Sequence, residues 1–96
     1  GQIAINPATG NVEATDIVGQ SKQVMANLKA VLEAAGTSFD KVVKTTCFLK
    51  DVARDFGAFN EVYAEAMGDA KPSRSCVGVA DLPKGVLCEV EVIAEL

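Results

Sequence analysis

Two amphipathic helical segments, each lying between strand-like segments, constrain the fold of this 96-residue chain more than any other feature. Apolar residues recur at three- and four-residue steps between Asp16 and Gly36, and again between Asp55 and Gly68. A helix that joins two strands of one sheet acts as a crossover and places those strands parallel. The sequence therefore predicts helices packed on a sheet.

Capping residues mark the expected ends of both helices. Thr15 or Asp16 can cap the first helix and Gly36 fits its end, whereas Asp55 is the expected cap of the second and Gly68 its end. The expected apolar stripe of the first helix is Val18, Ser21, Met25, Leu28, Val31, Leu32 and Ala35. Its expected exposed face is Gln20, Lys22, Gln23, Asn27 and Lys29.

The remaining segments read as strands and turns. Strands are expected at 1–5, 41–50, 73–80 and 86–95, with turns at 6–10 and 81–85. The last two strands are predicted to form an antiparallel hairpin. The result is an α+β fold with a mixed sheet and both helices on one face. A second subunit is the natural cover for the other face.

Residue content excludes several classes of function. Histidine is absent, which removes Ser-His-Asp triads, Cys-His dyads and the usual zinc sites. A net charge of −4 with scattered cations argues against nucleic-acid binding. No apolar stretch approaches the about 20 residues that cross a bilayer. Cys47, Cys76 and Cys88 are widely spaced, which is typical of reduced thiols and predicts a cytoplasmic protein.

The predicted last hairpin gathers the chain's most chemically suggestive residues. If Ala80 pairs with Gly85, then Arg74, Cys76 and a glutamate pair, Glu89 and Glu91, share one sheet face. A one-residue slip would place Arg74 and the glutamates on opposite faces. Two interpretations remain open. One is a solvated cross-strand ion pair, and the other is an anion site in which arginine grips a carboxylate.

Other candidates carry weaker signals. Cys76 is a possible nucleophile or a small packing residue, and Cys47 and Cys88 read as core residues. Asn60 borders the apolar face of the second helix, where it can be solvated or reach a cleft, and Tyr63 reads as core. No glycine-rich phosphate motif and no metal-ligand spacing is present, so no nucleotide and no metal site is predicted.

Six segments in order carry a resemblance over nearly the whole chain. They are GQIAINPATG (1–10), NLKAVLEAAG (27–36), VVKTT and FLKD (42–51), FNEVY (59–63), PSRSCV (72–77), and LPKGV (82–86) before Glu89. Together they resemble the RidA/YjgF family of reactive-intermediate deaminases. The resemblance implies one RidA-like domain over 1–96, with a chorismate-mutase-like fold. It also implies a homotrimer with a barrel-like core and clefts between subunits.

The resemblance also implies a reaction and roles for residues. The family hydrolyses imines and enamines of amino acids, such as 2-iminopropanoate, to 2-keto acids and ammonia, without a cofactor. By position, Arg74 would bind the substrate carboxylate and Glu89 would orient water. Cys76, Asn60 and Gly1 would line the site. Family members have opening strands before the segment matching Gly1, including a cleft tyrosine to which nothing here corresponds.

Two other functions remain as alternatives. One is a non-catalytic trimer that binds small carboxylates or another protein; it would use the same arginine but would not turn over a substrate. RNA cleavage or translational inhibition is attributed to some relatives, and the net charge of −4 and the absence of histidine count against it.

Overall fold

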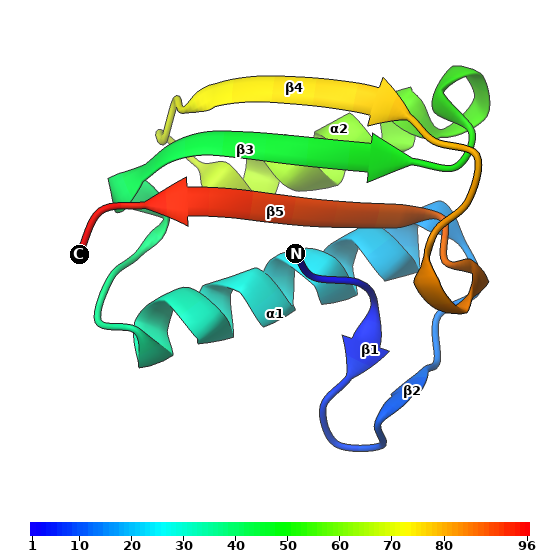
Figure 1. The fold of residues 1–96 in the computed structure, drawn as a ribbon, viewed down its shortest axis with the longest axis horizontal. Helices are drawn as coiled ribbons and strands as arrows, with labels where there is room; N and C mark the ends of the chain where they lie inside the picture. The colour runs from blue at the N-terminus through cyan, green and yellow to red at the C-terminus, as the bar shows by residue number, and fades with distance from the viewer.

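A three-stranded sheet carries both long helices on one face in the computed structural model, which describes residues 1–96 (Figure 1). The helices are α1 (Ile17–Ala34) and α2 (Val52–Met67), and they pack against each other as well as on the sheet. The strands are β3 (Val42–Leu49), β4 (Ser73–Gly78) and β5 (Cys88–Ala94). The prediction of a mixed α+β sheet with two helices on one face is confirmed.

The predicted hairpin between the last two strands is wrong. The strand order is β4-β3-β5, so β4 pairs parallel with one edge of β3 and β5 pairs antiparallel with the other. The central place of β3 satisfies the backbone groups on both edges of the longest strand. The connection after β4 passes the end of β3, where Lys50 N donates to Leu87 O at 3.0 Å and Val79 N donates to Leu49 O at 3.0 Å.

The hydrophobic core fills the layer between the sheet and the helices. Phe59 of α2, Val24 of α1 and Leu49 of β3 are fully buried there. Cys47 and Cys88 are also fully buried, which confirms their interpretation as core residues. The core explains why alternate residues of β3 are buried: one face of this strand meets the helices, and the other face stays open.

The two helix starts differ in how well the sequence predicted them. Asp16 caps α1 by accepting a hydrogen bond from Gly19 N at 3.0 Å, as expected. The predicted cap of α2 is wrong, because Asp51 caps it by accepting from Arg54 N at 3.0 Å. Asp55 lies one turn inside the helix and is buried, where it accepts side-chain hydrogen bonds from Arg54.

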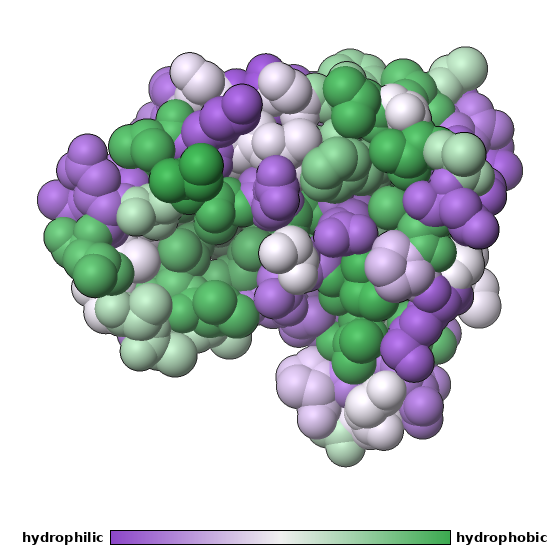
Figure 2. All heavy atoms as spheres, viewed as in Figure 1, coloured by the Kyte–Doolittle hydropathy of each residue, from purple (hydrophilic) through white to green (hydrophobic).

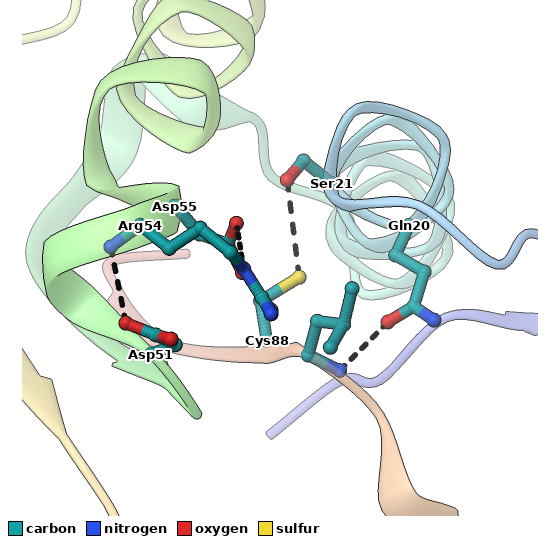
Figure 3. A network of polar contacts seen from close by, with 7 residues as sticks. Gln20, Ser21, Asp51, Arg54, Asp55 and Cys88 are labelled. Carbon is teal, nitrogen blue, oxygen red and sulfur yellow. Dashed lines mark hydrogen bonds and ion pairs between the residues drawn. The ribbon is translucent and has the colours of Figure 1, made fainter.

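Two polar residues predicted to face solvent on α1 instead hold neighbouring backbone. Gln20 is buried, donates to Ala14 O at 3.0 Å and accepts from Leu87 N at 2.8 Å (Figure 3). Asn27 donates to two carbonyl oxygens of the first segment, those of Ile3 and Ile5. Each side chain thus ties α1 to the backbone of another segment.

The first residues attach to the far edge of the sheet. Gln2 N donates to Val90 O at 2.8 Å, and Val90 N donates back to Gln2 O at 3.1 Å. Beyond this bridge, β1 (Ile5–Asn6) pairs only with β2 (Asn11–Val12) in a small separate hairpin. The strand predicted at 1–5 is therefore a single bridge at Gln2, a bend, and the first residue of β1. Neither α1 nor α2 is long and apolar enough to span a membrane.

Candidate functional site

The observed register separates the predicted site residues onto two faces of the sheet. Arg74 aligns with Thr45 of β3, and Cys76 aligns with Cys47, so both lie on the helix-facing side. Glu89 aligns with Phe48, one position out of phase, and points to the open side. The predicted shared face is wrong within one chain, because the pairing partner of both outer strands is β3.

The side chain of Arg74 lies along α2 and contacts only neutral groups of that helix. Its Nη1 donates to Asn60 Oδ1 at 2.6 Å. Its guanidinium carbon lies 4.6 Å from the ring centroid of Tyr63 and 5.7 Å from that of Phe56. These residues and Cys76 form what we call the Arg74 region. It contains an arginine supported on one side and open to solvent on the other.

Arg74 has no carboxylate partner. The chain contains two ion pairs, Lys50–Asp81 at 3.3 Å and Arg54–Asp55 at 2.8 Å, and neither involves Arg74. The interpretation as an ion pair with Glu89 or Glu91 therefore fails within the chain. An arginine with its charge uncompensated and most of its donors free is suited to bind an anion.

The Cys76 thiol is half-buried beside Arg74. Burial raises the pKa of Cys76, and the positive charge of Arg74 opposes that rise without cancelling it. The neighbouring Cys47 is more deeply buried, and burial raises its pKa to about 12. Both thiols are protonated near neutral pH, so the structure favours the packing interpretation of Cys76 over a nucleophile.

Gly1 and Glu89 adjoin each other at the other edge of the sheet. The Gly1 backbone lies so close to the Glu89 carboxylate that a Cβ at position 1 would collide with Oε2. Glycine at this position therefore leaves room for the carboxylate. The predicted site residues thus form two groups: Arg74, Asn60 and Cys76 in one, and Gly1 and Glu89 in the other.

A shallow cavity of about 220 Å³ lies beside Arg74. Asn60, Tyr63, Lys71 and Pro72 are among its lining residues, and no carboxylate lines it. Two larger hollows of about 360 Å³ each lie along α1 and include none of the predicted site residues. No group of three or more Cys, Asp or Glu side chains is placed to hold a metal ion.

A second polar cluster, which we call the Arg54 region, joins α1, α2 and β5 (Figure 3). Arg54 donates to both carboxylate oxygens of the buried Asp55, from Nε at 2.9 Å and from Nη2 at 2.8 Å. The Ser21 hydroxyl lies 3.9 Å from the Cys88 sulfur. Burial raises the pKa of Cys88 to about 11. The cluster is internally satisfied and offers no free cation.

Sequence reasoning missed two residues of the Arg74 region, Phe56 and Tyr63. The sequence predicts Tyr63 as a core residue, and it is buried, whereas Phe56 is 37% exposed. The signal that could have found them is spacing. Phe56, Asn60 and Tyr63 follow at steps of four and three, so they form one stripe on α2. An aromatic-amide-aromatic stripe is a good support for a guanidinium.

Known proteins resemble this chain over all or nearly all of its length. The family model described as Endoribonuclease L-PSP matches residues 1–96. A RutC family protein of Pyrococcus horikoshii is 53% identical over 94 residues, covering 98% of this chain and 74% of the relative. The structure of RidA from an Antarctic Psychrobacter is 38% identical with a TM-score of 0.93, covering 100% of this chain and 76% of that one. Escherichia coli TdcF with bound serine is 41% identical with a TM-score of 0.91, covering 98% and 75%.

Proposed function

Because the chain belongs to the Endoribonuclease L-PSP family, which includes RidA and YjgF, we propose that it hydrolyses 2-imino and 2-enamino acids to 2-keto acids and ammonia. The observation that carries the proposal is Arg74, a cation held by neutral groups with no ionic partner. No cofactor is needed in this proposal, because an imine carbon is already electrophilic.

Recognition of the substrate begins at its carboxylate. Asn60 occupies one donor of the Arg74 guanidinium, and the others remain available for a two-point contact with a carboxylate. Such a contact fixes the plane of a small 2-imino acid and positions its C=N bond. Orientation of this kind can lower a barrier by several kcal/mol. The serine bound to the related TdcF is a small carboxylate-bearing molecule and supports this ligand class.

The reaction then needs only water and a proton carrier. In the proposed mechanism the Glu89 carboxylate takes a proton from water as the water oxygen bonds to the imine carbon. Glu89 gives this proton to the imine nitrogen as the C=N double bond becomes a single bond, so the resulting carbinolamine carries a hydroxyl and an amino group on that carbon. Glu89 then carries the hydroxyl proton to the amino nitrogen, and the C–N bond breaks as the C=O bond forms. One imine and one water thus give one keto acid and one ammonia.

Arg74 and Glu89 lie on opposite faces of one sheet, so a site containing both requires two copies of the chain. The open face of the sheet presents exposed apolar side chains, among them Val77, which is 43% exposed, and Ile93, which is 62% exposed (Figure 2). Exposed apolar side chains on one sheet face favour burial by another subunit. We therefore propose a homotrimer in which Arg74 of one subunit meets Glu89 of the next.

The first experiment measures ammonia and keto-acid release from freshly generated 2-iminopropanoate. Arg74→Met should lower kcat/KM by about 100-fold, the loss expected for a hydrogen bond to a charged group. Glu89→Gln should lower kcat more than it changes KM. Full activity of a folded Arg74→Met protein would exclude the role of Arg74, and an unchanged kcat would remove Glu89.

Mixing the two inactive variants tests the shared site. In a cyclic trimer that contains both variants, one interface brings an intact Arg74 to an intact Glu89. Refolding equal amounts of Arg74→Met and Glu89→Gln subunits together should therefore restore about a quarter of the wild-type activity. A site built within one subunit would give no recovery. Each variant refolded alone is the control.

A second candidate function is binding of small carboxylates without turnover. It is favoured by the Arg74 region itself, which can hold a carboxylate without Glu89. Binding of 2-oxobutanoate with no ammonia release from any imine would select it. The family model's description keeps RNA cleavage as a third candidate, against which the net charge of −4 and the lack of histidine count. Salt-sensitive RNA binding with strand scission would select that candidate.

A further inference from the structure

Tyr63 has a position that core packing alone does not explain. Its side chain is buried, with its ring 6.0 Å from that of Phe59. Packing of this kind would be met equally by phenylalanine. The hydroxyl of Tyr63, however, forms a 2.9 Å hydrogen bond with Thr45 Oγ1, and Thr45 is itself buried in the central strand. The bond fixes the ring relative to the sheet.

Arg74 needs a support to hold its guanidinium in one orientation. The side chain is long and exposed, and holding it in one position costs rotamer entropy. Thr45 and Arg74 are register partners on adjacent strands, so the Tyr63 ring spans from one to the other. A guanidinium over an aromatic ring is attracted to it without losing its charge.

We propose that Tyr63 is a positioning residue for carboxylate binding: anchored by Thr45, its ring holds the Arg74 guanidinium in the plane that receives the substrate. Asn60 fixes one nitrogen of the fork, and the ring fixes the orientation of the whole fork. Phe56, at 5.7 Å, makes a weaker contact of the same kind. The inference rests on the proposed function in one respect, that Arg74 binds the carboxylate.

Loss of the ring and loss of the hydroxyl should have different effects. Tyr63→Leu removes the support and should weaken carboxylate binding about 10-fold. Tyr63→Phe keeps the ring but frees it from Thr45, so a loss of about 3-fold is expected. Thr45→Val breaks the same bond from the other side and should match Tyr63→Phe. The double variant should lose no more than either single one.

The test measures the Kd of 2-oxobutanoate, which does not react, by calorimetry on the assembled protein, and the KM and kcat of imine hydrolysis. Phe59→Leu is the matched control, because Phe59 packs against Tyr63, whereas the Arg74 guanidinium lies over the rings of Tyr63 and Phe56. A positioning role predicts a raised Kd and KM with kcat less affected in Tyr63→Leu, and no such change in Phe59→Leu. An equal rise in Phe59→Leu would overturn the inference.

A double-mutant cycle shows whether Tyr63 acts through Arg74. In an Arg74→Met background, Tyr63→Leu should weaken binding no further, whereas an undiminished 10-fold loss would refute the inference. If Tyr63→Leu does not fold, Tyr63→Phe and Thr45→Val still decide, since unchanged Kd in both contradicts the anchoring role. Undiminished binding by Arg74→Met itself would instead overturn the proposed function, so the two failures are distinguishable.

Discussion

The two arginines of this chain differ in whether a carboxylate within the fold compensates their charge. Arg54 donates twice to the buried carboxylate of Asp55, so its charge is compensated within the fold. Arg74 contacts the amide of Asn60 and two aromatic rings, so its charge is not compensated. The same residue type therefore stabilises the chain in one region and remains available to an anionic ligand in the other.

The thiols in these two regions also differ, because a charge of opposite sign lies near each of them. In the Arg54 region burial raises the pKa of Cys88, the contact with the Ser21 hydroxyl partly lowers it, and the negative charge of Asp55 adds to the rise. In the Arg74 region burial also raises the pKa of Cys76, but the positive charge of Arg74 works against it. Burial is the main cause of both raised pKa values, and the neighbouring charge acts in opposite directions on the two thiols. Activity, stability and thiol chemistry each test this difference between the two regions.

Activity gives the largest expected contrast. We expect Arg74→Met to lower kcat/KM for 2-iminopropanoate by about 100-fold, whereas Arg54→Met should leave it within about 3-fold of wild type. The reason is that only Arg74 has free donors for a carboxylate. Steady-state kinetics on both folded variants is the measurement. A similar loss in both variants would remove the distinction between the two regions.

Stability should give the opposite ranking. Asp55→Asn removes the charge that accepts two hydrogen bonds, and we expect it to lower the free energy of unfolding by about 1–3 kcal/mol. Arg54→Met should also lower it, because the buried Asp55 carboxylate is left without its partner. Arg74→Met should change it little. Urea denaturation measures all three, and a larger loss for Arg74→Met would contradict the assignment.

The fold was largely predictable because it depends on patterns that are local in the sequence. The three- and four-residue repeat of α1 and α2 and the alternation of β3 each describe one element. Strand order was not predictable in the same way. Whether β5 pairs with β4 or with β3 depends on which strand occupies the centre, and local alternation in residues 73–95 is the same in both cases.

The candidate site was predicted by residue but not by arrangement. The sequence predicts Arg74 and Glu89 as site residues, and they keep that status as a prediction. The face that each occupies follows from the strand order, so the wrong hairpin placed them on one face when they lie on opposite faces. Asp55 and Gln20 were misplaced for a related reason. Each is a polar residue whose burial becomes favourable only when a partner from another segment or a neighbouring side chain is placed beside it.

Raising the pH above 9 should lower the stability of the fold through its buried thiols. The folded chain retains the Cys88 proton up to pH about 11, whereas the unfolded thiol releases it near its ordinary pKa of 9.0. The stability from this difference is complete below pH 9 and is lost as the pH rises through 11. At pH 10 the loss should be about 1 kcal/mol.

Urea denaturation at pH 8, 9 and 10 checks this expectation. Cys88→Ala should reduce the fall in stability between pH 9 and pH 10 without abolishing it, because Cys47, with a pKa raised to about 12, contributes in the same direction. An identical fall in wild type and Cys88→Ala would mean that the Cys88 proton is not held by the fold.

The smallest expected effect is on the rate at which Cys76 is alkylated. Arg74 lowers the pKa of this thiol, and only the thiolate reacts, so Arg74→Met should slow its reaction with iodoacetamide at pH 8 by about 3-fold. Neutral iodoacetamide avoids direct attraction to the arginine. Arg54→Met is the control, because Arg54 is not among the groups that shift Cys76. Equal rates in wild type and Arg74→Met would show that the Arg74 charge is already screened at the thiol. A carboxylate ligand at the same distance would then be attracted less strongly than we propose for the uncompensated charge of Arg74.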